Sequence, residues 1–531
     1  MTDGLKDAHR AAIIAALAAN NRVERAVLFG SRATGTNTVT SAVDIALFGD
    51  RLTLTDQAHL AVAVDEIPMA QSVDLILYDS VSDRTLREHI RREGIEWYTQ
   101  PRSTHSDPDD WPMVRLGDHA ESCLGKMLDQ RKNRGELLPY LGNKNVRWGS
   151  FDTRELGRMR FEQHEHDRYG LKYGDLVVCE GGEPGRCAIW KDELPGMKIQ
   201  KALHRIRAGD QLDNRFLHYW FLLAGRNGAL EPYFTGTTIK HLTGRAIADL
   251  QIPLPFLSEQ RGIAHVLGTL DDKIELNRRM NEILEAMTRA LFKSWLVDFD
   301  PVRAKMEGRD TGLPDGISDL FPDRLVDSEM GKIPEGWEVV PLDVIARFRN
   351  GLALQKFRPA GNEARLPVVK IAQMRTGEAN SGEWASAAIK PECIIEDGDV
   401  LFSWSGSLLV MMWCGGRAAL NQHLFRVTSN RYPKWFYLHS LLSHLPAFRQ
   451  IAQDKATTMG HIRRHHLTEA LCVCPPSGVI AELTDMFSCL LDRQLATELN
   501  SRTLAALREA LLPKLISGEI RVPTTDRGPT Q

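Results

Sequence analysis

The chain has 531 residues, of which 43% are hydrophobic and 25% are charged, and its formal net charge is −3. That length predicts roughly three or four domains, and the near-neutral charge confines any nucleic-acid surface to local basic stretches. No apolar run approaches a membrane span, the first 20 residues lack a signal-peptide core, and the eight cysteines include no CxxC pair. We therefore expect a reduced, cytoplasmic protein with no membrane contact, no disulfide framework and no zinc site.

Residues 1–98 are predicted to form a small α/β domain. Strand patterns at RAVLFG, VDIALFG and SVDLILY alternate with helix patterns at AHRAAIIAALAAN and LAVAVDEI, and RTLREHIRREGIEWY indicates a closing helix. A turn with the sequence GSRATG, which starts at Gly30, joins the first two strands. Asp44 follows on the second strand and Asp74 on the third.

This arrangement resembles the minimal nucleotidyltransferase domain, whose pattern is GSRARG, then SDID, then an aspartate on a later strand. The resemblance implies that Gly30 and Ser31 hold nucleotide phosphates through backbone N–H groups, and that Asp44 and Asp74 are Mg²⁺ ligands. The family's first carboxylate falls on Ala42, which has no oxygen to offer a metal. We expect a retained fold without catalysis that serves as a docking or regulatory module. Weak nucleotidyl transfer and a coincidental strand–turn–helix match are the alternatives.

Two stretches have the pattern of unusually long amphipathic helices, and we place them at 258–300 and 477–520. In each, apolar residues recur at intervals of mainly three and four. A helix of about 40 residues spans roughly 60 Å, whereas an average helix has about 11 residues. Each one-sided apolar face needs a partner, so we predict that the two helices pair as an antiparallel coiled coil. Two core helices of separate domains are the alternative.

The first long helix has a polar residue near its apolar seam. Asn277 can fix the register of a coiled coil there, and Leu276-Asn277 matches Leu499-Asn500, 223 residues further on. The apolar stripe comprises Ile263, Val266, Leu267, Leu270, Ile274, Leu276, Met280, Ile283, Leu284, Met287, Leu291 and Leu296.

Shifts in composition divide the rest of the chain. Polar stretches with proline and glycine mark linkers, and strand-rich stretches mark domains. The predicted segments are a domain at 1–98, a linker at 99–110, a strand-rich domain at 111–257, the central helix at 258–300, a linker at 301–336, a second strand-rich domain at 337–476, the C-terminal helix at 477–520 and a tail at 521–531. The expected fold class is a multidomain α/β and α+β protein.

The two halves that follow residue 110 form an internal repeat. Five ordered matches lie 220 to 228 residues apart: WPMVRL with WEVVPL, NVRWG with QMRTG, GDLV with GDVL, IQKALHRI with LNQHLFRV, and GTTIKH with ATTMGH. Two domain–helix units whose helices pair antiparallel have pseudo-twofold symmetry and present two similar surfaces. DNA is a partner with that geometry, because it displays half-sites at fixed helical intervals.

Together these features resemble the specificity subunit of a type I restriction–modification system. The segments that carry the resemblance are WPMVRLGD, WEVVPLDV, TTIKHLT, TTMGHIR, IPLPFLSEQRGIAHVLGTLDDKIELN, LFKSWLVDFDPV and LLPKLISGEI, within about 111–521. The resemblance implies two target-recognition domains, each of which recognises half of a split site in double-stranded DNA. It also implies that the long helices set the spacing and bind two modification subunits, and that restriction subunits join this core. The domain before Trp111 departs from the common pattern.

Basic stretches occupy corresponding places in the two repeats and are our candidate DNA-binding surfaces. Residues 126–160 contain nine Lys/Arg and four Asp/Glu, and residues 345–375 contain seven Lys/Arg and one Glu. Arg463 and Arg464 also suit a DNA-facing or subunit-facing helix. The candidate DNA-binding residues are Lys126, Arg131, Lys132, Arg134, Asn143, Lys144, Arg147, Arg347, Arg349, Gln355, Lys356, Arg358, Lys370 and Arg375.

No catalytic residue and no cofactor are expected, because neither half shows a methyltransferase loop, a P-loop or a nuclease cluster. Two other functions remain open at this point. One is a nucleotidyltransferase that a DNA-binding C-terminal region targets, against which Ala42 argues. The other is a purely structural coiled-coil scaffold, against which the repeated basic domains argue.

Overall fold

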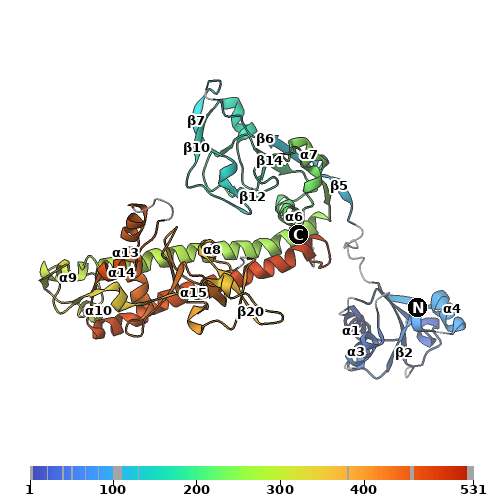
Figure 1. Cartoon of the computed structure of the whole chain (residues 1–531). Helices are drawn as coiled ribbons and strands as arrows, with labels where there is room; N and C mark the ends of the chain where they lie inside the picture. The colour runs from blue at the N-terminus through green and yellow to red at the C-terminus, as the bar shows by residue number, and fades with distance from the viewer. Residues whose placement is uncertain are drawn as a thin grey trace. The chain divides into compact units, whose positions relative to one another are not determined.

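The computed structural model of the chain (Figure 1) describes residues 4–18, 20, 22–38, 41–49, 52–65, 67–81, 83–99, 111–129, 131–379, 382–454 and 460–522. Most of the predicted linker 99–110, nearly all of the predicted tail, and four residues of the ATTMGH match lie outside these ranges. The chain divides into two compact units, one made of 1–263 with 515–531 and the other of 264–514. No helix in the described ranges is long and apolar enough to cross a membrane.

The N-terminal domain is a four-stranded sheet with helices packed on it. The sheet order is β3-β2-β1-β4, in which β2 and β3 are parallel and β1 is antiparallel to both of its neighbours. Ile13 and Leu17 of the first helix are buried against the sheet. The elements are α1 (Asp7–Ala18), β1 (Arg25–Phe29), α2 (Ser31–Thr34), β2 (Val43–Phe48), α3 (Leu54–Asp65), β3 (Val73–Leu77), α4 (Arg84–Glu93) and β4 (Ile95–Thr99).

The prediction of one closing helix over RTLREHIRREGIEWY is wrong for its last residues, IEWY. Helix α4 ends at Glu93, and IEWYT forms the edge strand β4 beside β1. A Cβ at Gly94 would lie 2.4 Å from both the Ile90 carbonyl oxygen and Val27 Cγ1, so the chain passes close to the sheet there. The β-branched and aromatic residues that follow favour a strand.

The two repeat domains share one strand order. In the first repeat domain (111–257) the main sheet is β12-β11-β14-β6, and in the second (337–476) it is β24-β23-β26-β19. Each domain also has a parallel pair, β7 with β13 and β20 with β25. Each is closed by an antiparallel pair of its first and last strands, β5 with β15 and β18 with β27. The internal repeat of the sequence is therefore a repeat of the fold.

The bounds of these elements follow the repeat. In the first repeat domain they are β5 (Met113–Arg115), β6 (Ala120–Leu124), β7 (Glu136–Leu141), β8 (Val146–Arg147), β9 (Ser150–Phe151), β10 (Gly157–Phe161), α5 (His166–Tyr169), β11 (Leu176–Cys179), β12 (Cys187–Ile189), β13 (Lys198–Ile199), β14 (Leu203–Ala208), α6 (Asn214–Asn227), α7 (Gly244–Asp249) and β15 (Gln251–Pro253). In the second they are β18 (Glu338–Pro341), α11 (Leu342–Ile345), β19 (Arg347–Asn350), β20 (Arg365–Val369), α12 (Ile371–Thr376), β21 (Trp384–Ser386), β22 (Ile394–Ile395), β23 (Val400–Ser403), β24 (Leu409–Met412), β25 (Ala418–Leu420), β26 (Leu424–Thr428), α13 (Lys434–Asp454), α14 (His465–Glu469) and β27 (Leu471–Cys474).

Two 40-residue helices, α8 (Leu257–Leu296) and α15 (Ser477–Ile516), run antiparallel, as predicted (Figure 1). Three side-chain pairs set their register: Asp271 with Arg508 at 2.6 Å, Asn277 with Asn500 at 2.9 Å, and Asn281 with Glu498 at 3.0 Å. Across these three pairs the residue numbers rise along α8 and fall along α15, so the two helices are antiparallel.

The Asn277–Asn500 pair marks the pseudo-twofold axis of the helix pair. The two residues are equivalent in the sequence repeat, and Asn277 Nδ2 donates directly to Asn500 Oδ1. In an antiparallel pair, equivalent residues meet only where the twofold axis passes. This hydrogen bond disfavours slipped registers, because slippage would leave the buried Asn277 amide without its partner.

The first long helix ends earlier than its sequence suggests. α8 ends at Leu296, Phe299 adopts a left-handed conformation with φ 59°, and Pro301 stands in the first turn of a new helix, α9 (Asp300–Met306). Proline is favoured in that position, because its missing N–H would be unpaired anyway. The stretch that we predicted as a linker, 301–336, also contains α10 (Asp315–Ser318), β16 (Leu325–Ser328) and β17 (Gly331–Pro334).

Aromatic packing joins both long helices to the second repeat domain. Trp435 of α13 stacks on Phe487 of α15 with ring centroids 4.4 Å apart, and Phe292 of α8 contacts Trp435 edge-on at 6.3 Å. Trp435 Nε1 donates to Thr484 Oγ1 over 3.1 Å, so its one polar atom is satisfied. All three rings lie in one buried cluster, and the domain and the helix pair therefore form one core.

Candidate nucleic-acid interface

In the first repeat domain, the loop after β7 packs against the hairpin between β11 and β12. Asn143 Nδ2 donates to the Gly181 carbonyl over 2.6 Å, and Arg186 Nη2 donates to Asn143 Oδ1 over 2.8 Å. Lys144 and Arg147 extend from the same loop with exposed side chains. The hairpin thus holds the Asn143 amide in place, and two cations beside it face solvent.

A second group of candidates lies at the other end of β7. Arg131, Lys132 and Arg134 precede this six-residue strand and are exposed. At about 3.3 Å per residue, the strand separates them from the first group by roughly 20 Å. The structure therefore divides the basic stretch of this domain into two clusters, one at each end of β7.

Lys126 belongs to neither cluster. Its side chain is buried, with 8% of the residue exposed, and its Nζ donates to the Arg160 carbonyl over 3.0 Å and pairs with Glu165. A buried cation that already has a carboxylate partner is not free to bind a phosphate, and removing either partner would leave an uncompensated buried charge. We leave Lys126 out of the proposed DNA surface for that reason.

The second repeat domain has the same two clusters around β20. Gln355, Lys356 and Arg358 precede this strand and are exposed. Lys370 and Arg375 follow it, at the start and in the last turn of α12. The Arg375 guanidinium donates to the Ser407 hydroxyl in the hairpin between β23 and β24, and Lys370 pairs with Glu383. The equivalent loop and hairpin therefore meet in both domains.

The remaining two candidates, Arg347 and Arg349, lie on strand β19, and Arg464 bonds to the residues that follow each of them on this strand. Arg464 Nη2 donates to the Phe348 carbonyl over 3.4 Å and to Asn350 Oδ1 over 3.1 Å. A cavity of about 460 Å³ is lined by all three arginines. Sequence reasoning singled out each arginine but had no signal that they share one surface, and it did not single out Trp404 or Phe425, which line the adjoining cavity.

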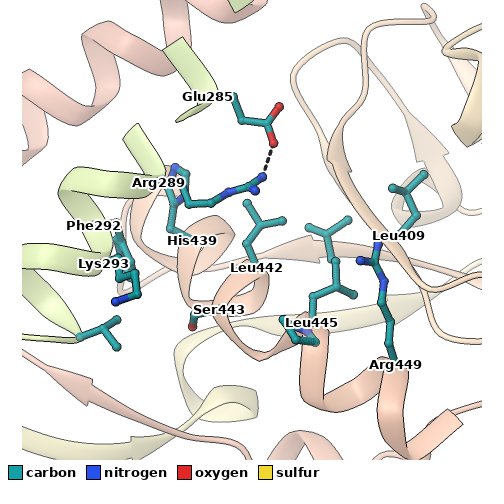
Figure 2. A pocket seen from close by; sticks show the side chains of 13 residues that line it. Glu285, Arg289, Phe292, Lys293, Leu409, His439, Leu442, Ser443, Leu445 and Arg449 are labelled. Carbon is teal, nitrogen blue, oxygen red and sulfur yellow. Dashed lines mark hydrogen bonds and ion pairs between the residues drawn. The ribbon is translucent and has the colours of Figure 1, made fainter. Parts of the chain in front are cut away.

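A mainly apolar cavity of this domain lies away from all these candidates. It has a volume of about 430 Å³ and lies between α8, α13 and β24 (Figure 2). Its two cations on α8 are already paired, Arg289 with Glu285 and Lys293 with Asp298. Burial, aided by Arg289, lowers the pKa of His439 to about 4, so this ring is neutral at physiological pH. The cavity belongs to the core that joins helix to domain.

In the predicted phosphate turn of the N-terminal domain, Gly30 adopts a backbone conformation with positive φ. Gly30 has φ 74° and ψ −154°, and a Cβ there would lie 2.5 Å from Asp44 Oδ2. Only glycine adopts this conformation readily, and the close approach leaves no room for a side chain. The turn and the Asp44 carboxylate are thus in direct contact.

Asp44 and Asp74 are register neighbours on the parallel strands β2 and β3. Burial and then the Asp74 carboxylate raise the pKa of Asp44, while the Arg32 guanidinium opposes this rise. Arg32 is 1% exposed and donates to the Ser41 and Ala42 carbonyls over 2.6 and 3.1 Å. Two adjacent carboxylates fit one Mg²⁺ ion, since a cation would relieve their repulsion. The methyl group of Ala42 leaves the pair of ions found in nucleotidyltransferases one ligand short.

Comparison with known proteins agrees with this architecture. Residues 108–286 match the family model described as the type I restriction modification DNA specificity domain, and residues 11–103 match the model described as polymerase beta, nucleotidyltransferase. Residues 108–286 are therefore similar to a type I DNA specificity domain, and residues 11–103 are similar to a nucleotidyltransferase domain.

Its relatives extend this finding over most of the chain. The type I restriction enzyme MjaIX specificity subunit of Methanocaldococcus jannaschii is 24% identical over 81% of this chain and 98% of its own. The HindI specificity subunit of Haemophilus influenzae is 22% identical over 79% and 96%. The crystal structure of the type I S subunit from M. genitalium covers 76% of this chain and 96% of its own, with 15% identity and a TM-score of 0.48. The two sequence relatives confirm the resemblance to type I specificity subunits.

Proposed function

We propose that this chain is the DNA sequence-recognition subunit of a type I restriction–modification complex, and that it binds a split site in duplex DNA. One observation carries the proposal: two domains with one strand order are attached to an antiparallel helix pair that has Asn277 and Asn500 at its centre. Such a chain carries two related domains, and two half-sites displayed at a fixed helical interval are a matching partner.

Within each domain, the exposed basic clusters at the two ends of β7 and β20 are the proposed DNA surface. Lysine and arginine there suit phosphate contacts, which set affinity and register without sequence information. Side chains that neighbouring groups hold in place, such as Asn143 and Arg375, suit contacts to base edges in the major groove. Mapping methylated adenines in a host that carries this chain and its modification subunits tests the proposal. A split motif should appear with the gene and vanish without it, and a continuous motif would contradict the proposal.

An exposed apolar stripe on α8 supports docking of the modification subunits on the long helices. Leu276, Met280, Ile283 and Met287 are 38% to 62% exposed, although sequence periodicity placed them in the buried stripe. They lie to one side of the seam that Asn277 occupies, at helical spacings of four, three and four. Exposed apolar side chains at such spacing mark a helix face that a partner covers. The repeat places Leu499, Thr503, Ala506 and Ala510 at the equivalent positions of α15, and we propose two modification subunits, which restriction subunits then join.

Replacing Ile283 with glutamate is expected to weaken binding of the modification subunit by at least about tenfold. Loss of one buried isoleucine contact removes about 1.5–3 kcal/mol, and the new carboxylate must be desolvated. The fold should survive, because Ile283 is 62% exposed. Val344→Glu makes the same kind of change at an exposed apolar residue (54% exposed) outside both long helices, and should leave binding intact. Co-purification at fixed salt measures both, and equal retention of the two variants would contradict the docking face.

We further propose that the N-terminal domain is a catalytically silent adaptor. Gly30 and Ser31 keep the phosphate turn, and Asp44 with Asp74 would hold one Mg²⁺, which would neutralise nucleotide phosphates there. Transfer also needs the second ion, for which Ala42 offers no ligand. A nucleotidyltransferase that the rest of the chain targets to DNA is the competing function.

Deleting residues 1–105 is accordingly expected to leave DNA methylation by the assembled complex at its full level. Both repeat domains and both long helices remain in that variant. Label transfer from ATP, measured for the whole chain and for Asp44→Ala, decides about catalysis. Transfer by the whole chain that disappears in Asp44→Ala would show that the domain is an enzyme. Ala42→Asp, which supplies the third carboxylate, is the informative gain-of-function control.

A further inference from the structure

We propose that the second repeat domain holds one unstacked DNA nucleotide, with its base in an aromatic cavity beside Trp404 and its phosphates on Arg347, Arg349 and Arg464. The proposal rests on the DNA-binding function and adds a nucleotide site to it. The corresponding residues of the first repeat domain cannot form this site.

The base would lie in a cavity of about 290 Å³ next to the hairpin that follows β23. Three of its lining side chains are aromatic: Trp404 lies 6.0 Å from Phe425 and 6.4 Å from His461, measured between ring centroids. The Trp404 and His461 ring planes are nearly perpendicular, at 81°. Walls of this kind stack on the face of any base, and such stacking is worth about 1–3 kcal/mol per base.

Polar groups at the same cavity suit the edge of a base. The Asn350 amide lines the cavity and is held by Arg464. Trp404 Nε1 is a buried donor without a hydrogen-bond partner in the part of the chain that the structure describes. Buried donors are usually paired, so a ring nitrogen or carbonyl oxygen of a base is a suitable acceptor. The cavity thus combines aromatic faces with a few directional polar groups, as small-ligand sites do.

A cationic cavity of about 460 Å³ adjoins the aromatic one. The two share Asn350 and Arg464, and Arg347 and Arg349 line only the cationic side. Arg464 stands between them, with its Cζ 5.6 Å from the Phe425 ring centroid. Three guanidinium groups exceed the two carboxylates of this cavity, and guanidinium groups bind phosphate in bidentate fashion. A base site beside a phosphate site is the arrangement that a nucleotide needs.

The first repeat domain carries the opposite chemistry at the same places. The strand pairing of β19 with β26 matches that of β6 with β14, which aligns the two domains residue by residue. The equivalents of Arg347, Arg349, Trp404 and Arg464 are Glu121, Cys123, Glu180 and Gly244. Two carboxylates there would repel a phosphate, and no arginine or indole replaces those of the second domain. The nucleotide site is therefore separate from the basic clusters that both domains share.

The geometry favours an unpaired or extruded nucleotide over a base pair. A base inside a duplex shows only its edges, whereas this cavity offers faces to stack on. Extruding a base from a duplex costs a few kcal/mol, an energy that three charge-assisted phosphate contacts and aromatic stacking can supply. An acidic peptide is the other ligand that three arginines would attract, and the test below separates it.

The test titrates the full chain against a short single-stranded DNA that carries one 2-aminopurine, whose fluorescence falls when the base stacks. Wild-type chain should quench the probe. Arg347→Glu and Arg464→Gly, the residues of the first domain, should each weaken binding by about tenfold, or about 1.4 kcal/mol. Arg431→Glu, an equal charge reversal at an exposed position of the same domain, should bind like wild type. Circular dichroism establishes that each variant folds.

Three results would overturn the proposal. Equal weakening by Arg431→Glu would show only general electrostatics. Binding without quenching would exclude base stacking. A glutamate-rich peptide that binds with the same dependence on Arg347 and Arg464, while the DNA probe does not bind, would make an acidic peptide the ligand. A parallel titration with duplex DNA that carries the methylated motif separates the nucleotide site from the DNA-recognition function. If the chain binds the duplex but not the single-stranded probe, the nucleotide site is contradicted and the DNA-recognition function stands. If it binds neither DNA, both proposals are contradicted.

Discussion

Exchanging residues 337–476 for the equivalent region of another specificity subunit is expected to change one half of the methylated motif and leave the other half and the gap unchanged. The structure makes this exchange possible because β18 and β27 pair antiparallel, from Glu338 with Cys474 to Pro341 with Leu471. Both ends of the exchanged segment therefore lie side by side, and one closed domain is replaced. The first repeat domain is closed in the same way by β5 and β15.

The exchange must preserve the core between domain and helices. Trp435 stacks on Phe487 of α15 and contacts Phe292 of α8, so a donor domain needs an aromatic side chain of similar size at that position. Removing a buried tryptophan typically costs about 3–5 kcal/mol, enough to unfold many domains. Mapping methylated adenines for parent and chimera gives the result, and exchange of 111–257 is the reciprocal control. A change in both halves of the motif would contradict independent recognition by the two domains.

Lengthening both long helices by seven residues is expected to widen the gap between the half-sites and leave their sequences unchanged. Seven residues make one heptad, which keeps the coiled-coil seam in phase and adds about 10 Å. Because base pairs follow each other at about 3.4 Å, the gap should grow by about three base pairs. The insertions belong after Gly268 in α8 and after Ala510 in α15, since the pairing of Asp271 with Arg508 places these points opposite each other.

Methylation mapping again provides the measurement. A seven-residue insertion in the exposed turn between β16 and β17, after Glu329, is the matched control, because it lengthens the chain outside both helices. That variant should keep the parental gap. An unchanged gap in an active complex with longer helices would show that spacing is set elsewhere.

The sequence by itself determined the features that depend on local pattern or on self-similarity. Apolar spacing of three and four predicted both long helices, because one face of an amphipathic helix must be buried whatever the partner is. The five repeat matches predicted two domains of one fold, and both main sheets have the same strand order. The apolar spacing also placed Asn277 near the seam, and Asn277 forms a hydrogen bond with its repeat equivalent Asn500. The glycine turn at Gly30 was also predicted, since its geometry is local.

Only the tertiary structure decided which of these residues are buried and which meet. The apolar spacing of α8 contains two adjacent stripes, and packing against α15 covers one and leaves Ile283 and its neighbours exposed. The sequence predicted Lys126 as a surface cation, but in the structure it is buried and pairs with Glu165 and the Arg160 carbonyl. The cationic cavity is lined by both Arg347 and Arg464, which lies 117 residues further on. Burial and contact between distant segments depend on how whole elements pack, and no local pattern records that packing.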